Sequence, residues 1–251
     1  MEPQANYKTK YTIGISDVDF METLKISALF KYFQELASAH ADLLGFGIDL
    51  ISSKHNVTWV LVKIKVDIDR LPKWNEEIEI ETWPLKPKRF EFQRDYIVRD
   101  KAGNVIIRAI SDWVIMDVTS RELKKAELIQ INLSNYIENR AIEERLGKLK
   151  PFGTPELAYK KTIRYSDIDI NEHLTNSRYV DYIMDCFPCD SHKEYRVSSI
   201  QVNFINEALP GETISLNRDI PEIDTNSVYI EGLNEKSSSQ IFSSIVKVER
   251  R

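Results

Sequence analysis

Apolar residues recur at helical spacing in two stretches of the chain, one in each half. In both stretches they follow the pattern i, i+3, i+7, which places them on one face of a helix. They are Phe30, Phe33 and Ala37 in the first stretch, and Val180, Ile183 and Phe187 in the second. The pattern predicts a first helix over Ser27–Leu44, which Gly45 would end, and a second helix that ends before Pro188.

Strand-like segments surround each predicted helix. A short extended segment precedes it, at Tyr11–Ile15 in the first half and at Thr162–Tyr165 in the second. Segments rich in β-branched and aromatic residues follow it. They are Val57–Asp69, Glu77–Trp83, Phe90–Arg99 and Val105–Asp117, and then Arg196–Ile205, Thr213–Arg218, Ser227–Gly232 and Gln240–Glu249. An antiparallel sheet that wraps a central helix covers the apolar faces of both. The pattern therefore predicts an α+β fold, a tandem (double) hotdog.

Residues 12–32 and 162–182 are two copies of one segment, 150 positions apart. Nine residues are identical between them: Thr12/Thr162, Ile13/Ile163, Ser16/Ser166, Asp17/Asp167, Asp19/Asp169, Glu22/Glu172, Leu24/Leu174, Ser27/Ser177 and Tyr32/Tyr182. The differences are chemical. The second copy has Asn171, His173 and Asn176 where the first has Met21, Thr23 and Ile26. The repeat indicates that one unit was duplicated and that only the second copy carries the polar groups.

The repeat and the strand pattern divide the chain into two similar units and a connector. We expect an N-terminal hotdog over residues 7–118 and a C-terminal hotdog over 159–251. Residues 119–158 between them form a linker, in which Ser134–Leu146 is predicted to be helical. The two units would form one internal pseudo-dimer, so the chain is expected to be a monomer or to pair as a homodimer.

Composition excludes several classes of function. The formal net charge of −5 argues against nucleic-acid binding, which needs a basic surface. No stretch has the roughly 18 consecutive apolar residues that a membrane span requires. The N-terminal residues lack the apolar core of a secretory signal and the composition of a transit peptide. The two cysteines cannot form a disulfide framework. We expect a soluble cytoplasmic protein with neither cofactor nor metal.

Three polar residues, Asp169, Asn171 and His173, alternate just before the second helix. If the segment is extended, alternate side chains point the same way, so the three would share one face. A helix that starts near Asn176 or Ser177 would add unpaired N–H groups and the positive end of its dipole. Such a site suits attack on an acyl carbonyl. Asn176 is equally explained as a simple helix cap.

The chain resembles the acyl-acyl-carrier-protein (acyl-ACP) thioesterases of plants and bacteria over about residues 7–249. The family signature D-x-N-x-H-x-x-N is present as Asp169-Ile-Asn171-Glu-His173-Leu-Thr-Asn176. In the stretch QVNFINEALPGE, the position of the family's catalytic acidic residue is Glu207. Plant members often have Cys after it, but Ala208 stands there and excludes a cysteine nucleophile. The first-half stretch LPKWNEEIEIETW also matches the family.

The resemblance implies hydrolysis of a thioester by an activated water, without a cofactor. Glu207 and His173 would polarise or deprotonate the water, Asn171 would position the carbonyl, and Asp169 would orient Asn171 and His173. The substrate would be a fatty acyl chain on acyl carrier protein, with Asn176 at the substrate. The first unit would bind the acyl chain, for which Met21, Thr23 and Ile26 are the candidates. The alternative is that these residues only repack a site that has lost its chemistry.

Other functions remain open at this stage. The same site would serve hydrolysis of acyl-coenzyme A. A non-catalytic acyl-binding protein would be expected to lose the polar residues in both copies, and the family string with Glu207 argues against a dehydratase. Cys186 and Cys189 have C-x-x-C spacing, but they lie at a helix end and have no second cysteine pair, which argues against a redox or zinc site.

Overall fold

The computed structural model describes residues 5–129, 136–219 and 226–251. These residues form two compact units. The first holds most of the chain up to Leu146, and the second holds Gly147–Arg251 together with Ile26–Phe30 and Lys65–Ile68. Within the described ranges, no helix is both long and apolar enough to cross a membrane.

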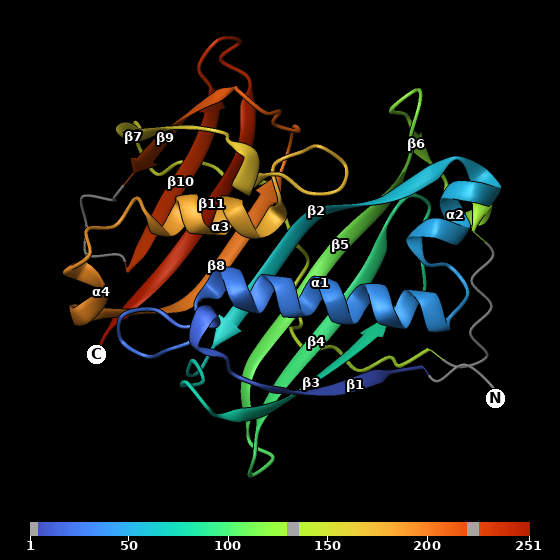
Figure 1. Cartoon of the computed structure of the whole chain (residues 1–251), viewed down its shortest axis with the longest axis horizontal. Helices are drawn as coiled ribbons and strands as arrows, with labels where there is room; N and C mark the ends of the chain where they lie inside the picture. Colours follow the sequence, from blue (N-terminus) through green and yellow to red (C-terminus); the bar gives the residue numbers. More distant parts are fainter. Residues whose placement is uncertain (1–4, 130–135, 220–225) are drawn as a thin grey trace. The chain divides into compact units, whose positions relative to one another are not determined.

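The first unit is a sheet with one long helix on its face (Figure 1). The strand order is β1 (Tyr7–Thr12), β3 (Glu77–Pro84), β4 (Phe92–Asp100), β5 (Val105–Asp117) and β2 (Val57–Ile68). The helix α1 (Ile26–Leu43) buries Phe33 and Leu36, and the ring of Phe33 lies 4.6 Å from that of Tyr96 on β4. Gly45 follows the helix at φ +79°, a left-handed conformation that ends helices and that glycine adopts without strain.

The second unit repeats this plan with a shorter helix. Its sheet has the order β8 (Tyr195–Phe204), β11 (Gln240–Arg250), β10 (Ser227–Asn234), β9 (Thr213–Asp219) and β7 (Glu156–Thr162). The helix α3 (Asn176–Met184) buries Val180 and Ile183 completely. Alternate residues along β9 and β10 are buried, as expected for strands that cover a helix with one face. The predicted α+β tandem hotdog is confirmed.

Short elements between the main ones were not predicted. They are the helices α2 (Ile48–His55) and α4 (Ser191–Glu194), the strand β6 (Leu123–Lys124), and the 3₁₀ turns η1 (Ile15–Asp17), η2 (Ala126–Leu128) and η3 (Tyr165–Asp167). The two extended segments before the helices lie earlier than predicted, since β1 ends at Thr12 and β7 at Thr162. The residues after them form η1 and η3 instead.

The helix predicted over Ser134–Leu146 is wrong for residues 136–146, which are irregular. Ser134 and Asn135 lie outside the described residues. Tertiary contacts override the local preference for helix, because the backbone groups of this segment bond to side chains of the first unit. The Asp95 carboxylate accepts the N–H of Ala141 at 2.7 Å, and the indole of Trp83 donates to the carbonyl of Asn139 at 3.1 Å. The domain bounds 7–118, 119–158 and 159–251 stay a prediction.

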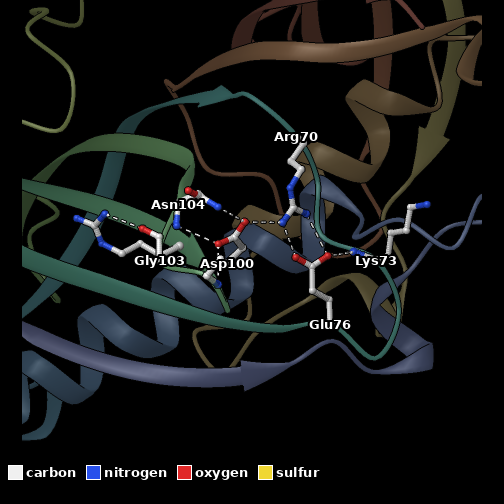
Figure 2. Close-up of polar contacts among 8 residues, drawn as sticks. Arg70, Lys73, Glu76, Asp100, Gly103 and Asn104 are labelled. Carbon is white, nitrogen blue, oxygen red and sulfur yellow. Dashed lines mark hydrogen bonds and ion pairs between the residues drawn. The ribbon is translucent and has the colours of Figure 1, made fainter.

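A cluster of charged groups joins two loops of the first unit (Figure 2). The guanidinium of Arg70 donates to both carboxylate oxygens of Glu76, at 3.0 and 2.6 Å, and to Asp100 at 3.2 Å. Glu76 also accepts the backbone N–H of Lys73 at 3.0 Å. Asp100 accepts the N–H of Asn104 at 2.9 Å and so closes the hairpin turn between β4 and β5. Arg70 therefore ties the loop after β2 to this turn.

Replacing Arg70 by Gln is expected to reduce the acid sensitivity of folding. The Arg70 hydrogen bond holds the pKa of Glu76 below its ordinary value of 4.5. A carboxylate with a depressed pKa stabilises the fold above that ordinary value, and the contribution is lost as the pH falls through the folded pKa. Because Arg70 is 42% exposed, we expect about 1 kcal/mol or less. Urea unfolding at pH 7 and pH 3.5 measures the difference.

The matched control is Arg108→Gln, since Arg108 is also 42% exposed and pairs with Asp69 at 3.2 Å. An Arg70→Gln protein whose unfolding free energy changes with pH as that of the wild type does would contradict this role for Arg70.

Candidate active site

The candidate catalytic residues lie in a tight loop between η3 and α3. Ile168 and Leu174 pair as an isolated bridge and close the loop. Inside it, the N–H of Asp169 donates to the carbonyl of His173 at 2.9 Å. The side chain of Asp169 turns back and accepts the N–H groups of Asn171 at 2.8 Å and His173 at 3.4 Å. This is the turn that aspartate favours, because its carboxylate bonds to the backbone two residues on.

The expectation of an extended segment with three side chains on one face is therefore wrong. Glu172, in the middle of the loop, has φ +61°, which an extended strand does not allow. Asp169 acts through the backbone N–H groups of Asn171 and His173 and sets the course of the chain there. Asn171 is exposed, whereas His173 and Asp169 are half-buried.

The helix α3 starts directly after this loop, as predicted. Its first residue is Asn176, and the preceding Thr175 donates its N–H to the carbonyl of Asp167 at 2.9 Å. The cap position is thus occupied by Thr175, so the interpretation of Asn176 as the cap residue is wrong. The N-terminal N–H groups of α3 follow His173 by a few residues. The dipole of α3 favours negative charge at the N-terminal end of the helix.

Glu207 comes to this loop from a different part of the second unit. It lies in the segment between β8 and β9. Its Oε2 atom lies 3.5 Å from Nε2 of His173, and the two side chains are 40% and 26% exposed. A backbone hydrogen bond of 3.0 Å from the N–H of Leu174 to the carbonyl of Ala208 joins the two segments. An acidic group, an imidazole and open access to water are thus present together.

The first copy builds the same loop without the chemistry. The carboxylate of Asp19 accepts the N–H groups of Met21 at 2.8 Å and Thr23 at 3.1 Å. The N–H of Leu24 donates to the carbonyl of Pro72 at 2.8 Å, as Leu174 does to Ala208. By this correspondence the counterpart of Glu207 is Leu71. The first copy therefore keeps the backbone hydrogen bonds and lacks both members of the His–Glu pair.

The candidates for acyl-chain binding stand in and next to this first loop. Thr23 and Ile26 are buried and Met21 is half-buried. The hydroxyl of Thr23 donates to the Asp19 carboxylate, with its oxygen 3.0 Å from the nearer carboxylate oxygen. Their role in binding the acyl chain stays a prediction.

The sequence analysis assigned no role to Asp167, although the first copy of the repeat has the same residue type, Asp17, at the corresponding position. Asp167 is buried, and its carboxylate accepts the N–H of Arg164 at 2.9 Å. Its carbonyl receives the N–H of Thr175 at the helix start. In the first copy the hydroxyl of Tyr32 donates to Asp17 at 2.7 Å. Asp167 therefore fixes where α3 begins, and Asp17 has the corresponding structural role in the first copy.

Cys186 is not a reactive thiol. Burial raises the pKa of the Cys186 thiol to about 12, so the nucleophilic thiolate is not populated at neutral pH. Both Cys186 and Cys189 are free thiols. Among the residues with described positions, no group of three or more His, Cys, Asp or Glu side chains is arranged to hold a metal ion.

Comparison with known proteins places the whole arrangement in one family. The profile of the acyl-ACP thioesterase N-terminal domain matches residues 4–129, and that of the C-terminal domain matches residues 155–245. A chloroplastic oleoyl-acyl carrier protein thioesterase of Coriandrum sativum is 26% identical over 90% of this chain and 65% of its own. A chloroplastic dodecanoyl-[acyl-carrier-protein] hydrolase of Cinnamomum camphora is 28% identical over 80% of this chain and 56% of its own. The chain thus spans between half and two thirds of the length of these relatives.

Solved structures agree with this placement. An acyl-ACP thioesterase of Bacteroides thetaiotaomicron is 27% identical and superposes with a TM-score of 0.88, covering 98% of both chains. A 12:0-ACP thioesterase of Umbellularia californica has the same fold, with a TM-score of 0.86 at 23% identity over 99% of this chain and 98% of its own. With both domain profiles matched in order along its length, the chain belongs to the acyl-ACP thioesterase family.

Proposed function

We propose that the protein hydrolyses the thioester of fatty acyl-acyl carrier protein to a free fatty acid and acyl carrier protein. The observation that carries the proposal is the approach of His173 and Glu207 to 3.5 Å in the second copy of a duplicated loop. Family membership supports the substrate class. The first copy, with Thr23 and Leu71 at the corresponding positions, holds no such pair.

The reaction needs a base for water and a stabiliser for the oxyanion. Glu207, held beside His173, takes a proton from a water molecule as its oxygen forms a bond to the thioester carbonyl carbon. The carbonyl π electrons move to oxygen, and the N–H groups at the start of α3 stabilise the oxyanion. The carbon–sulfur bond then breaks, and the sulfur leaves as a thiol with a proton returned from the site. Asn171 positions the carbonyl, and Asp169 holds the loop that carries Asn171 and His173.

The first copy of the repeat takes the acyl chain in this proposal. Met21 and Ile26 offer apolar surface where the second copy has Asn171 and Asn176, and Asn176 contacts the substrate near the thioester. Replacement of amides by apolar side chains favours a hydrocarbon chain over a polar ligand. Acyl carrier protein is the partner, and its prosthetic arm delivers the thioester to the second unit.

Release of free thiol from a series of acyl-ACP substrates of graded chain length tests the function. The same chains on coenzyme A separate the two carriers. We expect turnover of acyl-ACP with a higher kcat/KM than for acyl-coenzyme A of equal length. Thiol release no faster than the uncatalysed rate with every substrate would refute the proposal and favour a non-catalytic acyl-binding protein. Formation of an enoyl product from 3-hydroxyacyl-ACP, without thiol release, would identify a dehydratase instead.

A further inference from the structure

Large apolar side chains are exposed on both of the segments that carry His173 and Glu207. They are Tyr165 and Ile170 on the first segment, and Ile205 and Leu209 on the second. Tyr165 and Ile170 are 91% and 89% exposed, and the other two are each 46% exposed. All four belong to the second unit. Together they form the apolar rim of the site.

The two most exposed members of the rim stand on loops whose backbone is fixed. Ile170 lies between Asp169 and Asn171, and the Asp169 carboxylate accepts the N–H of Asn171 at 2.8 Å. Tyr165 opens η3, and the carbonyl of the next residue accepts a hydrogen bond from the Arg178 guanidinium at 3.2 Å. The hydrogen bonds of the two loops therefore hold both side chains in solvent.

The other two members of the rim lie on either side of Glu207. The N–H of Ile205 donates to the carbonyl of Ile241 at 2.9 Å, and the N–H of Leu209 donates to the Glu212 carboxylate at 2.8 Å. A backbone hydrogen bond, described above, joins this segment to the loop of the imidazole. The rim therefore flanks the reactive pair from both segments, on a backbone that is already ordered.

The first copy has the same backbone hydrogen bonds in this second segment but charged side chains. Asp69 corresponds to Ile205, because each donates its N–H to a carbonyl on the adjacent strand, at 3.0 and 2.9 Å. Lys73 corresponds to Leu209, because each donates its N–H to a glutamate carboxylate, at 3.0 and 2.8 Å. The backbone therefore does not require apolar side chains at these places. They are present only in the copy that has the reactive pair.

The segment that carries Glu207 also lacks positive charge. Residues 197–217 contain no lysine or arginine, whereas residues 61–81 of the first copy contain Lys63, Lys65, Arg70 and Lys73. Coenzyme A carries phosphate groups on its nucleotide, and proteins bind phosphates with lysine and arginine side chains. The segment offers such groups no cation. An exposed apolar cluster instead fits the surface of another protein.

We propose that the apolar rim is the docking surface for the body of the acyl carrier protein, which lays an apolar patch of its own against Tyr165 and Ile170. The prosthetic arm then passes from the docked carrier to the reactive pair. The inference rests on the proposed function, in which a carrier delivers the thioester to His173 and Glu207. Burial of exposed apolar area supplies the affinity, and an ordered surface loses little entropy on binding.

The choice of the carrier as the occupant follows from the position of the rim. Ile170 follows Asp169 directly, and Ile205 and Leu209 stand two residues before and after Glu207. A molecule that brings a thioester to the reactive pair therefore comes against the rim. The carrier protein is the part of that substrate with an extended surface, and only such a surface covers side chains that are almost fully exposed.

The double variant Tyr165→Ser, Ile170→Ser tests the docking role. We expect kcat/KM for acyl-ACP to fall roughly ten- to a hundredfold through KM, because truncating an anchor residue of an interface costs on the order of tenfold. The same acyl chain on pantetheine alone, which lacks the carrier body, should be hydrolysed within about twofold of the wild-type rate. Titration with fluorescently labelled holo-acyl carrier protein should give a Kd raised by a similar factor.

The duplication supplies the matched control, Ile15→Ser, Phe20→Ser. These residues stand at the corresponding positions of the first copy and are also exposed. The control removes exposed apolar side chains of the same kind from a loop without the reactive pair. It is expected to keep kcat/KM for acyl-ACP, and the Kd for the carrier, within about twofold of the wild type.

A second double variant, Ile205→Ser, Leu209→Ser, removes the rest of the rim. The first copy has polar side chains at these places on the same hydrogen-bonded backbone, so the substitution is compatible with the fold. We expect the same selective loss, with kcat/KM lowered for acyl-ACP and spared for acyl-pantetheine. If Tyr165→Ser, Ile170→Ser does not fold, this variant decides the matter by the same two substrates.

The outcomes separate this inference from the proposed function. A wild-type protein that does not hydrolyse acyl-ACP would refute the function, whereas the carrier titration tests the rim without any turnover. An unchanged Kd in the folded rim variants would overturn the docking role alone. An equal loss toward acyl-pantetheine, or an equal loss in the control, would overturn it too.

Two further measurements exclude other occupants of the rim. A rim variant that sediments as a monomer where the wild type is a dimer, with an unchanged carrier Kd, would assign the rim to contact between two copies of this chain. Loss of wild-type binding to phosphatidylglycerol vesicles, again with an unchanged carrier Kd, would assign it to a lipid surface. Either result would overturn the proposal.

Discussion

The Glu207→Gln protein is expected to lose about 10²–10⁴-fold in kcat toward acyl-ACP, the range typical of a lost general acid or base. Glutamine keeps the size of the side chain and its place opposite His173 but cannot accept a proton from water at neutral pH. Glu207 is exposed and lies 3.5 Å from the imidazole. Its replacement removes little buried structure, so thermal stability should stay near that of the wild type. Steady-state rates and a melting curve on the same preparation measure both.

Glu235→Gln is the control for a general effect of lost charge. Glu235 is exposed and pairs with Lys160 at the surface of the same unit. The Glu235→Gln protein is expected to retain full activity. A Glu207→Gln protein that is folded and hydrolyses acyl-ACP within threefold of the wild-type rate would remove Glu207 from the mechanism and leave His173 as the base.

The Asp169→Ala protein is expected to lose about 10²-fold in kcat, although Asp169 makes no bond to its neighbours' side chains in the loop. Its carboxylate holds the N–H groups of Asn171 and His173. Without it the loop loses the bonds that define its course, and His173 leaves its place beside Glu207. A misplaced catalytic group of this kind costs about as much as the stated factor. The loss of buried or half-buried hydrogen bonds should also lower stability by about 1–2 kcal/mol.

The duplication supplies the control for Asp169→Ala in the same molecule. Asp19 makes the corresponding bonds, to Met21 at 2.8 Å and to Thr23 at 3.1 Å. Asp19→Ala should therefore cost at least as much stability, because Asp19 also accepts the hydroxyl of Thr23. It should leave kcat within about threefold, because no reacting group stands in that loop. If both variants lose kcat to the same extent, the first loop takes part in the reaction beyond chain binding.

Much of the fold was predictable because its signals are local and strong. The long helix was placed within one residue at each end, Ser27–Leu44 against the observed Ile26–Leu43, since apolar spacing and Gly45 mark it. The strand β5 was predicted with its observed bounds, Val105–Asp117. The segment 136–146 was not predictable in this way. Its conformation depends on bonds to Asp95 and Trp83, which are distant in sequence.

The sequence predicted which residues form the site better than it predicted how they are arranged. Asp169, Asn171 and His173 stand out by contrast with the first copy, and Glu207 was found through the family resemblance. The tight loop was missed because alternation of polar residues is shared by strands and by aspartate turns. The bridge between Ile168 and Leu174 that decides between them is set by the fold.

The preserved turn in the first copy has a consequence for reading similar sequences. The string Ser-Asp-x-Asp occurs in both copies, at Ser16–Asp19 and at Ser166–Asp169, and in both it builds the same hydrogen-bonded loop. A search pattern based on it detects the architecture and says nothing of activity. A pattern for the working copy asks in addition for His four residues after the last Asp, as His173 follows Asp169. Applied to duplicated chains, it would tell which half works, or whether both or neither do.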